Sequence, residues 1–192
     1  MEENLKIVVI GAHEYHENNP EHLRIIGECQ EIGELAAKNN FTIITGGSPG
    51  FPAFVAEACF LHGGKTYAIT AALNEKEQRL EGNPVKIFSK IQYLPRYYKR
   101  FSFMERLHYR IIDLVQQGNI LISIGGAYGT AIEFCSNQNL NKCPVFVLES
   151  GGFSGQIRNI TSSELGSSAK IFYYSTGREL MEVIILAIAN LV

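Results

Sequence analysis

Short apolar runs that end at glycine recur along this chain, and segments with helical periodicity separate them. The clearest runs are Lys6–Ile10, Phe41–Thr45 and Ile120–Ile124, each followed directly by glycine. Runs rich in β-branched residues are typical of strands that are buried on both faces of a sheet. Weaker runs of the same kind are Thr66–Thr70, Val85–Tyr93, Pro144–Leu148 and Ile171–Tyr174. The pattern predicts an α/β fold with a doubly wound, mainly parallel, Rossmann-like sheet.

Helical segments fill the intervals between these runs, so helices are expected on both faces of the sheet. Their expected ranges are Glu21–Lys38, Phe54–Leu61, Pro95 to about Gln117, Gly129–Asn137 and Arg178–Leu191. The polar stretch Ala71–Asn83 is expected to form a loop with some helix. No internal repeat, low-complexity tract or linker divides the 192 residues. We therefore expect a single domain over residues 1–192.

The charge balance narrows the classes of partner. Lysine and arginine number 17 against 19 aspartate and glutamate residues, which disfavours the broad basic surface of a nucleic-acid binder. Charged residues make up 19% of the chain and hydrophobic residues 46%, a composition that excludes general disorder. No apolar run approaches the ~18 residues of a membrane span, and the N-terminus has no signal-peptide pattern. We expect a cytoplasmic protein with no membrane partner.

The four cysteines are far apart in the sequence and form no C-x-x-C pair. This spacing does not indicate a zinc site or a disulfide framework. The expected role of Cys29, Cys59, Cys135 and Cys143 is that of small buried residues in a reducing compartment. The sequence indicates no metal site and no cofactor.

Glycine-rich turns follow two of the predicted strands. The first reads Thr45-Gly46-Gly47-Ser48-Pro49-Gly50, and the second reads Gly125-Gly126-Ala127-Tyr128-Gly129-Thr130. Unobstructed backbone N–H groups and the dipole of a following helix together form an anion site. Neither turn has the dinucleotide motif or the P-loop motif. Tight packing can explain one such turn, but two at one edge of a sheet favour a small molecule that carries a phosphate.

Glu133 lies just beyond the second turn and has two interpretations. Thr130-Ala131-Ile132-Glu133 fits the capping-box pattern S/T-x-x-E, in which the glutamate closes the start of a helix. Alternatively, Glu133 is a carboxylate held above the phosphate loop, within reach of a ribose. The residues alone leave both interpretations open.

The segment before the second turn concentrates positive charge on the predicted Pro95 helix. Phe103, Leu107, Ile111 and Leu114 recur at helical spacing and are expected to form its buried stripe. Arg106, Arg110 and Asp113 then share a neighbouring face.

Arg110 and His108 each allow a structural and a functional interpretation. Arg110 either pairs with Asp113 on a solvated face, or binds a phosphate or an active-site carboxylate with its planar fork. His108 is favoured as a partly buried histidine beside the apolar stripe and is a candidate ligand contact.

Together these pieces resemble the Lonely-Guy (LOG) proteins, long labelled "lysine decarboxylase-like", within the SLOG nucleotide-binding superfamily. That family has a P-G-G-x-G-T-x-x-E loop preceded by an M-H-x-R-K helix segment. The corresponding stretches here are Gly125–Glu133 and Leu107-His108-Tyr109-Arg110-Ile111, with matching spacing from the arginine to the loop. The turn at Gly46–Gly50 is similar to the other glycine loop of the family, one residue shorter. Gly125, Ala127, Leu107 and Ile111 depart from the family pattern.

The resemblance implies a phosphoribohydrolase that cleaves the N-glycosidic bond of a nucleoside 5′-monophosphate. Arg110 and Glu133 correspond to the catalytic pair of the family, and the two glycine loops with His108 to ligand contacts. Neither metal nor redox cofactor is implied. Because LOG proteins commonly pair through helices beside the site, a homodimer or larger homo-oligomer is expected, with Arg96–Phe103 as a candidate contact.

Other functions remain open on the same fold. Molybdenum-cofactor carrier proteins resemble this arrangement and bind without hydrolysis, so a nucleotide or cofactor carrier is the main alternative. A transferase that moves deoxyribose to another base would use a similar carboxylate. Handling of single-stranded DNA is disfavoured because no continuous basic stripe is present.

Overall fold

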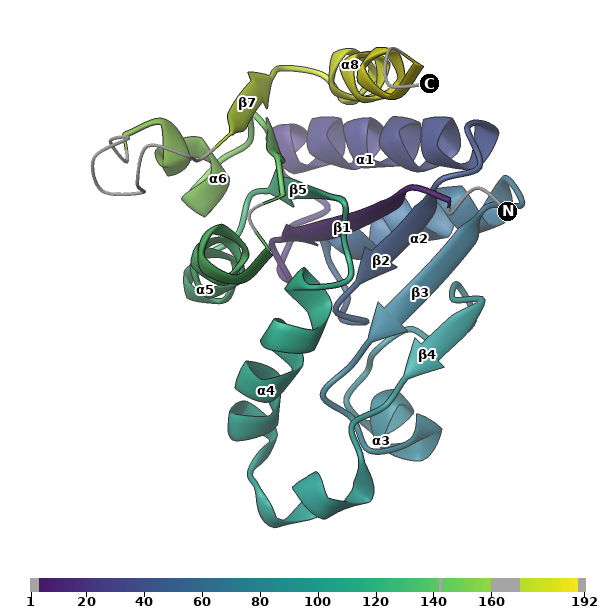
Figure 1. The fold of residues 1–192 in the computed structure, drawn as a ribbon, viewed down its shortest axis with the longest axis vertical. Helices are drawn as coiled ribbons and strands as arrows, with labels where there is room; N and C mark the ends of the chain where they lie inside the picture. Colours follow the sequence, from purple (N-terminus) through teal and green to yellow (C-terminus); the bar gives the residue numbers. More distant parts are fainter. Residues whose placement is uncertain (1–3, 142, 160–169, 190–192) are drawn as a thin grey trace.

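The computed structural model describes residues 4–141, 143–159 and 170–189. Figure 1 shows a single sheet with helices packed against it. The strands are β1 (Lys6–Gly11), β2 (Thr42–Thr45), β3 (Lys65–Ile69), β4 (Lys90–Gln92), β5 (Ile120–Ile124), β6 (Val145–Leu148) and β7 (Ile171–Tyr174). Every pair of neighbouring strands is parallel, and the order across the sheet is β4-β3-β2-β1-β5-β6-β7. The predicted doubly wound parallel sheet is confirmed.

The sheet changes winding direction between β1 and β5. The chain moves outward from β1 through β2 and β3 to β4, and then returns to the other side of β1 with β5. In open α/β sheets, ligands bind beyond the carboxyl ends of the strands at such a switch point. The ends of β1 and β5 are joined directly, since the Ala12 N–H donates to the Ile124 carbonyl at 2.9 Å.

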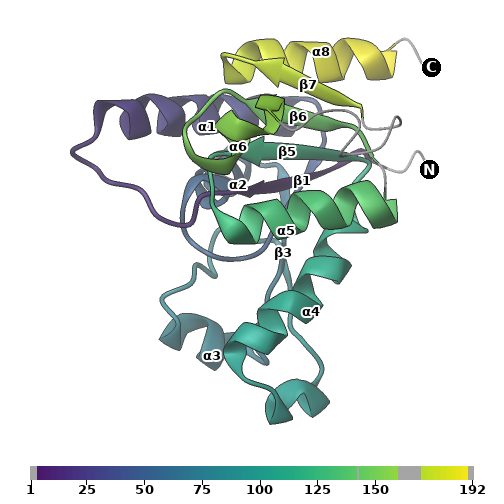
Figure 2. The same cartoon turned by 90° about the vertical axis from the view of Figure 1, so that its left-hand side faces the viewer.

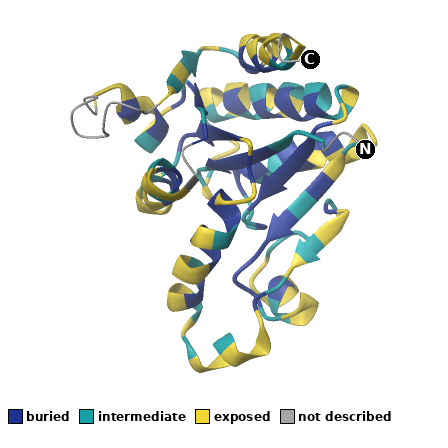
Figure 3. Cartoon of the chain, in the orientation of Figure 1, coloured by how far each residue is buried: buried dark blue, intermediate teal, exposed yellow. Residues whose placement is uncertain are grey.

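Two layers of helix cover the sheet, as Figure 2 shows. One layer contains α1 (Pro20–Lys38), α2 (Phe51–Leu61) and α8 (Gly177–Ala189), and the other contains α4 (Phe103–Val115) and α5 (Tyr128–Ser136). Alternate residues of β1 enter the two cores, with Ile7 and Val9 on the first side and Val8 and Ile10 on the second. Figure 3 shows the central strands buried along their length. Burial on both faces explains their continuous apolar sequence.

The long helix predicted from Pro95 to about Gln117 is wrong as a single element. A 3-10 segment, η1 (Arg96–Arg100), comes first, and α4 then begins at Phe103. Phe101 has extended backbone angles, and Ser102 starts the new helix by forming a capping box with Glu105. Capping satisfies N–H groups that a continuous helix would have bonded internally, so it stabilises a fresh start.

Short elements complete the chain. These are α3 (Glu75–Leu80), η2 (Asn137–Asn141), α6 (Gly152–Gln156) and η3 (Ile157–Asn159). The strand predicted over Val85–Tyr93 contracts to three residues at the sheet edge, where only β3 pairs with it. The helix α6 was not predicted. The last residues of the predicted closing helix lie outside the described residues.

Candidate functional site

The two glycine-rich turns lie on either side of the end of β1. The first follows β2 and the second follows β5, and both strands pair with β1 in register. All three strands are parallel, so their carboxyl ends meet at one edge of the sheet. The sheet therefore brings the two turns to the crevice where a ligand is expected.

Arg110 of α4 connects the two turns. Its Nη1 donates to Oε1 of Glu133 on α5 at 2.8 Å, and both residues are buried. Its guanidinium also lies against the backbone of Gly46, where an added Cβ would stand 2.4 Å from Nη1. A larger residue at that position would displace the guanidinium from its present place. A single side chain thus contacts the first turn and the helix that follows the second.

Burial sets the electrostatics of this pair. Removal from water raises the pKa of Glu133 above its ordinary value, and the charge and hydrogen bond of Arg110 offset part of that rise. The Nε of Arg110 is buried and makes no hydrogen bond among the described residues. The pair thus joins a carboxylate to a guanidinium that retains one buried donor for an oxygen atom.

The second turn is braced from the side of β6. Ser150 Oγ accepts the Gly125 N–H at 2.7 Å, and the Gly125 carbonyl accepts from Ser154 Oγ at 2.7 Å. The Gly126 carbonyl accepts the Phe153 N–H at 2.7 Å. These bonds hold the backbone of both glycines and use the Gly125 N–H. The bracing serines were missed by the sequence analysis, because nothing in their local pattern marks them.

The start of α5 retains the N–H groups that could receive an anion. Ala127 is its N-cap and provides no side-chain hydrogen bond, so the amides of Tyr128, Gly129 and Thr130 form an uncapped first turn. Gly126 has φ +96°, and an added Cβ would lie 2.0 Å from Thr130 Oγ1. Any side chain there would collide with the helix start.

By contrast, the helix that follows the first glycine turn has no amide cluster free to bind an anion. The Phe51 N–H donates to the Ala12 carbonyl at 3.0 Å, Pro52 has no N–H, and the Ala53 N–H donates to the Gly50 carbonyl at 3.0 Å. The start of α2 therefore offers no open amide cluster. Ser48 is half-buried within this turn. The first turn holds Arg110, whereas the second exposes helix amides.

The structure excludes one of the two interpretations left open for Glu133 and for Arg110, and it corrects the expected burial of His108. Glu133 is not a capping-box residue. That pattern requires Thr130 to be the N-cap of α5, whereas the N-cap is Ala127. Arg110 pairs with Glu133 rather than with Asp113. His108 is exposed rather than partly buried, and its Nδ1 lies 2.8 Å from the Met104 carbonyl of its own helix.

The buried face of α4 also differs from the predicted stripe. Ile111 and Leu114 are buried as expected, but Phe103 and Leu107 are only half-buried. The buried side chains of α4 are Arg106, Arg110, Ile111, Leu114 and Val115. The arginines tolerate burial because carboxylates pair with them. Among the cysteines, Cys135 is exposed whereas the other three are buried, and no disulfide joins any of these described residues.

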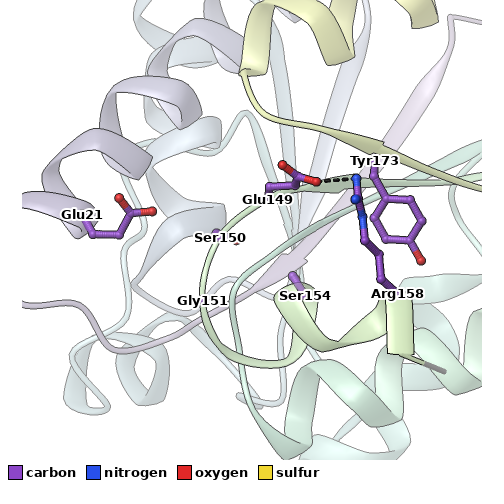
Figure 4. A pocket seen from close by; sticks show the side chains of 8 residues that line it. Glu21, Glu149, Ser150, Gly151, Ser154, Arg158 and Tyr173 are labelled. Atoms are coloured by element: carbon purple, nitrogen blue, oxygen red, sulfur yellow. Dashed lines mark ion pairs between the residues drawn. The ribbon is translucent and has the colours of Figure 1, made fainter.

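A separate cavity of about 310 Å³ lies at the ends of β6 and β7, as Figure 4 shows. Glu149 pairs there with Arg158, whose guanidinium lies 4.6 Å from the centroid of the Tyr173 ring. Ser150 and Ser154 form another wall, with their hydroxyls engaged at Gly125. Neither Arg110 nor Glu133 lines this cavity. Its charged groups are already paired, so we place the candidate chemistry at the Arg110–Glu133 pair.

Within residues 4–141, 143–159 and 170–189, no group of three or more metal-binding side chains is placed to hold an ion. No helix among these residues is both long enough and apolar enough to cross a bilayer.

Comparison with known proteins supports the fold and a family. The sequence profile of the SLOG cluster4 family matches residues 4–181. No curated protein sequence matches the chain. TM1055, the molybdenum cofactor proteins and DNA processing protein A are each less than 25% identical to the chain, so their likeness shows the fold alone.

Three solved structures illustrate this likeness. TM1055 superposes with a TM-score of 0.75 at 22% identity, covering 95% of this chain and 99% of that one. The molybdenum cofactor binding protein of Rippkaea orientalis gives 0.70 at 18% identity, with 98% and 99% covered. The molybdenum cofactor carrier protein of Chlamydomonas reinhardtii gives 0.69 at 17%, with 97% and 99% covered. Structures of DNA processing protein A share the fold as well, with TM-scores of 0.63.

Proposed function

The chain belongs to the SLOG cluster4 family, and on that premise we propose that it is a nucleoside 5′-monophosphate phosphoribohydrolase. Its products are the free base and ribose 5-phosphate. The observation that carries the proposal is the buried Arg110–Glu133 pair, which joins the first glycine turn to the helix that follows the second. A paired carboxylate and guanidinium beside an open helix N-terminus match the charges of such a substrate.

The phosphate binds at the first turn of α5. The unused amides of Tyr128, Gly129 and Thr130 donate to its oxygens, and the helix dipole favours its negative charge. Gly126 keeps the approach free of a side chain. Fixing the phosphate orients the attached ribose relative to Glu133, which lies one turn further along the same helix.

Glu133 acts on the sugar during cleavage. The bond between C1′ and the base nitrogen breaks, the electron pair leaves with the base, and positive charge develops on the ribose ring. The carboxylate of Glu133 stabilises that charge and accepts hydrogen bonds from ribose hydroxyls. A water molecule then adds hydroxide to C1′, and its proton balances the charge on the departing base. Arg110 favours the ionised form of Glu133 against the effect of burial and orients its carboxylate.

The proposal is tested by incubating the purified protein with a panel of nucleoside 5′-monophosphates. We expect ribose 5-phosphate and free base to appear in equal amounts for at least one of them. The corresponding nucleosides, which lack the phosphate, are the matched controls and are expected to react at least about 100-fold more slowly, because the phosphate contacts are lost. If no monophosphate is cleaved at micromolar enzyme, the hydrolase proposal fails.

A carrier that binds a nucleotide or cofactor without cleaving it is the second candidate. One observation favours it: the carboxylate of Glu133 is engaged with Arg110 and is buried, as a structural ion pair would be. The same panel separates the two functions. A carrier raises its melting temperature with a ligand that is recovered intact, and a transferase releases base only when a second base is supplied. Nucleic acid remains disfavoured by the net charge of -2.

We infer further that two copies of the chain associate through the segment that extends from the sheet at the start of α4 (Figure 1). Tyr97, Tyr98, Phe101 and Tyr109 form a ring cluster there, with centroid separations of 4.4 to 5.8 Å. Met104 and Ile112 extend it along the exposed side of α4. Exposed aromatic and apolar side chains gathered in this way are typical of an interface, and a two-fold axis lets such a surface cover itself.

Self-association makes a specific prediction. Tyr109→Glu is expected to weaken the dimer at least about tenfold, because it places a charge within the aromatic cluster. Light scattering across a dilution series measures the change. Leu186→Glu is the control, since Leu186 is 62% exposed on α8, away from this surface. A monomeric wild type, or equal effects of both variants, would contradict the inference.

A further inference from the structure

Gln78 is a completely buried polar side chain on the short helix α3. Its amide is hydrogen-bonded at both ends. Oε1 accepts from Thr70 Oγ1 at 2.6 Å, and Nε2 donates to the Gly47 carbonyl at 2.7 Å and to the Pro84 carbonyl at 3.3 Å. The side chain thus ties α3 to the end of β3 and to the first glycine turn.

The helix that carries Gln78 is anchored to the helix that carries Arg110. Glu77 accepts two hydrogen bonds from Arg106 of α4, at 2.6 and 3.0 Å, and a third from the Leu73 N–H at 2.6 Å. Arg106 is buried and lies one turn before Arg110. This bidentate pair holds α3 in place against α4. A helix of six residues would not be stable by its helix propensity alone.

Gln78 is hydrogen-bonded to the residue that follows Gly46, the glycine against which Arg110 packs. Gly47 is held on both sides, because its N–H donates to Thr45 Oγ1 at 3.1 Å and its carbonyl accepts from Gln78. The preceding residue, Gly46, is the one against which the Arg110 guanidinium packs. Peptide planes are rigid, so a rotation at Gly47 displaces Gly46 and removes the surface on which Arg110 rests.

We propose that Gln78 is a positioning residue for the Arg110–Glu133 pair. It fixes the first glycine turn so that the guanidinium contacts Gly46 and Glu133 together. The proposal rests on the function proposed above. Among the described residues, Gln78 makes no hydrogen bond to Arg110 or Glu133. It acts on the pair through its hydrogen bond to Gly47.

The chemistry of the site requires an amide or its equivalent. One end must accept from Thr70 and the other must donate to Gly47. A protonated glutamic acid has the same shape and provides both an acceptor and a donor. An ionised glutamate provides acceptors only and repels the Gly47 carbonyl. The substitution Gln78→Glu therefore converts the positioning bond into one that depends on pH.

The test is the ratio of kcat for Gln78→Glu to kcat for the wild type, measured between about pH 5 and about pH 8. We expect a ratio near one at the acid end and a loss of at least about tenfold at the alkaline end, since a buried unmatched acceptor is costly. KM is expected to change less than about threefold, because the phosphate binds at α5. The control Glu75→Gln alters the exposed Glu75–Arg79 pair of the same helix and should give a constant ratio.

A second measurement needs no catalysis. The Nε–H resonance of Arg110, assigned with Arg110→Lys, is expected to coincide in the variant and the wild type at about pH 5 and to shift at about pH 8. A pH-independent ratio, or an unmoved Arg110 resonance while the variant remains folded by circular dichroism, would overturn the role of Gln78. If the wild type cleaves nothing, the hydrolase proposal fails, and the resonance still decides whether Gln78 positions Arg110.

Discussion

Replacing Glu133 with glutamine is expected to lower the rate of glycosidic cleavage about 10³-fold, while nucleotide affinity changes less than about threefold. The amide has the shape of the carboxylate and keeps an oxygen acceptor for Arg110 Nη1. In the wild type, that nitrogen lies 2.8 Å from Oε1 of Glu133. It lacks the negative charge that stabilises the developing positive charge on the ribose. Single-turnover kinetics measure the rate, and calorimetry measures the affinity for the intact nucleotide.

Glu149→Gln is the matched control for this variant. Glu149 also pairs with an arginine, Arg158, beyond the end of a parallel strand. It lines the separate cavity near β6 and β7, which Glu133 does not line. Its replacement should leave kcat within about twofold of the wild type, as expected for an exposed pair. Equal losses from both substitutions, or an unchanged rate in Glu133→Gln, would remove Glu133 from the catalytic step.

The pH dependence of the wild type follows from the burial of Glu133. Burial raises the pKa of this carboxyl above its ordinary value, and the proposed chemistry needs the ionised form. Activity is therefore expected to fall as the pH falls through that raised pKa. The residual activity of Glu133→Gln should lack this acid limb, because its amide does not titrate.

Replacing Arg110 with methionine is expected to lower the free energy of unfolding by about 3–5 kcal/mol near neutral pH. The variant leaves the Glu133 carboxylate buried, with no partner from α4, in a core that includes Phe134 and Leu114. Urea denaturation measures the loss. The double variant Arg110→Met, Glu133→Leu removes both charges and should recover more than half of it, since an apolar pair of similar volume has no charge to desolvate.

The pH dependence of this loss has a defined sign. Without Arg110, the pKa of Glu133 in the folded protein rises further above the unfolded value of about 4.3. The folded state then binds more protons than the unfolded state between those two values, so its stability decreases as the pH rises through the window. The deficit of Arg110→Met should thus be smaller at about pH 5 than at about pH 8. A deficit that is equal at both values would show that Glu133 finds another partner.

The sheet and both glycine turns could be predicted from sequence because their causes are local. Burial on both faces requires continuous apolar runs such as Ile120–Ile124, and the sharp turn after each strand requires glycine. For Arg110, the sequence allowed either a pair with Asp113 or binding to a phosphate or an active-site carboxylate. The pairing with Glu133 is decided by the packing of α4 against α5, which no local pattern contains.

The residues that support the site were missed for a related reason. Gln78 lies in a polar stretch that resembles an ordinary surface loop, and only the three-dimensional fold brings it to Gly47. The break before α4 was missed although Ser102 and Glu105 fit the capping pattern, because Pro95 also fits the start of a helix. The packing of Ser150 against Gly125 likewise depends on the order of strands β5 and β6.

The central position of β1 has a consequence for how the protein is made. Its partner β2 leaves the ribosome soon after it, but β5 is more than one hundred residues further along the chain. At ~5–20 residues per second, β1 waits on the order of 10 s with one apolar edge unpaired. A nascent chain that stalls before β5 therefore presents Ile7–Ile10 as a ready template for aggregation. The strand that brings the two halves of the site together is thus also the one that waits longest for its second neighbour during synthesis.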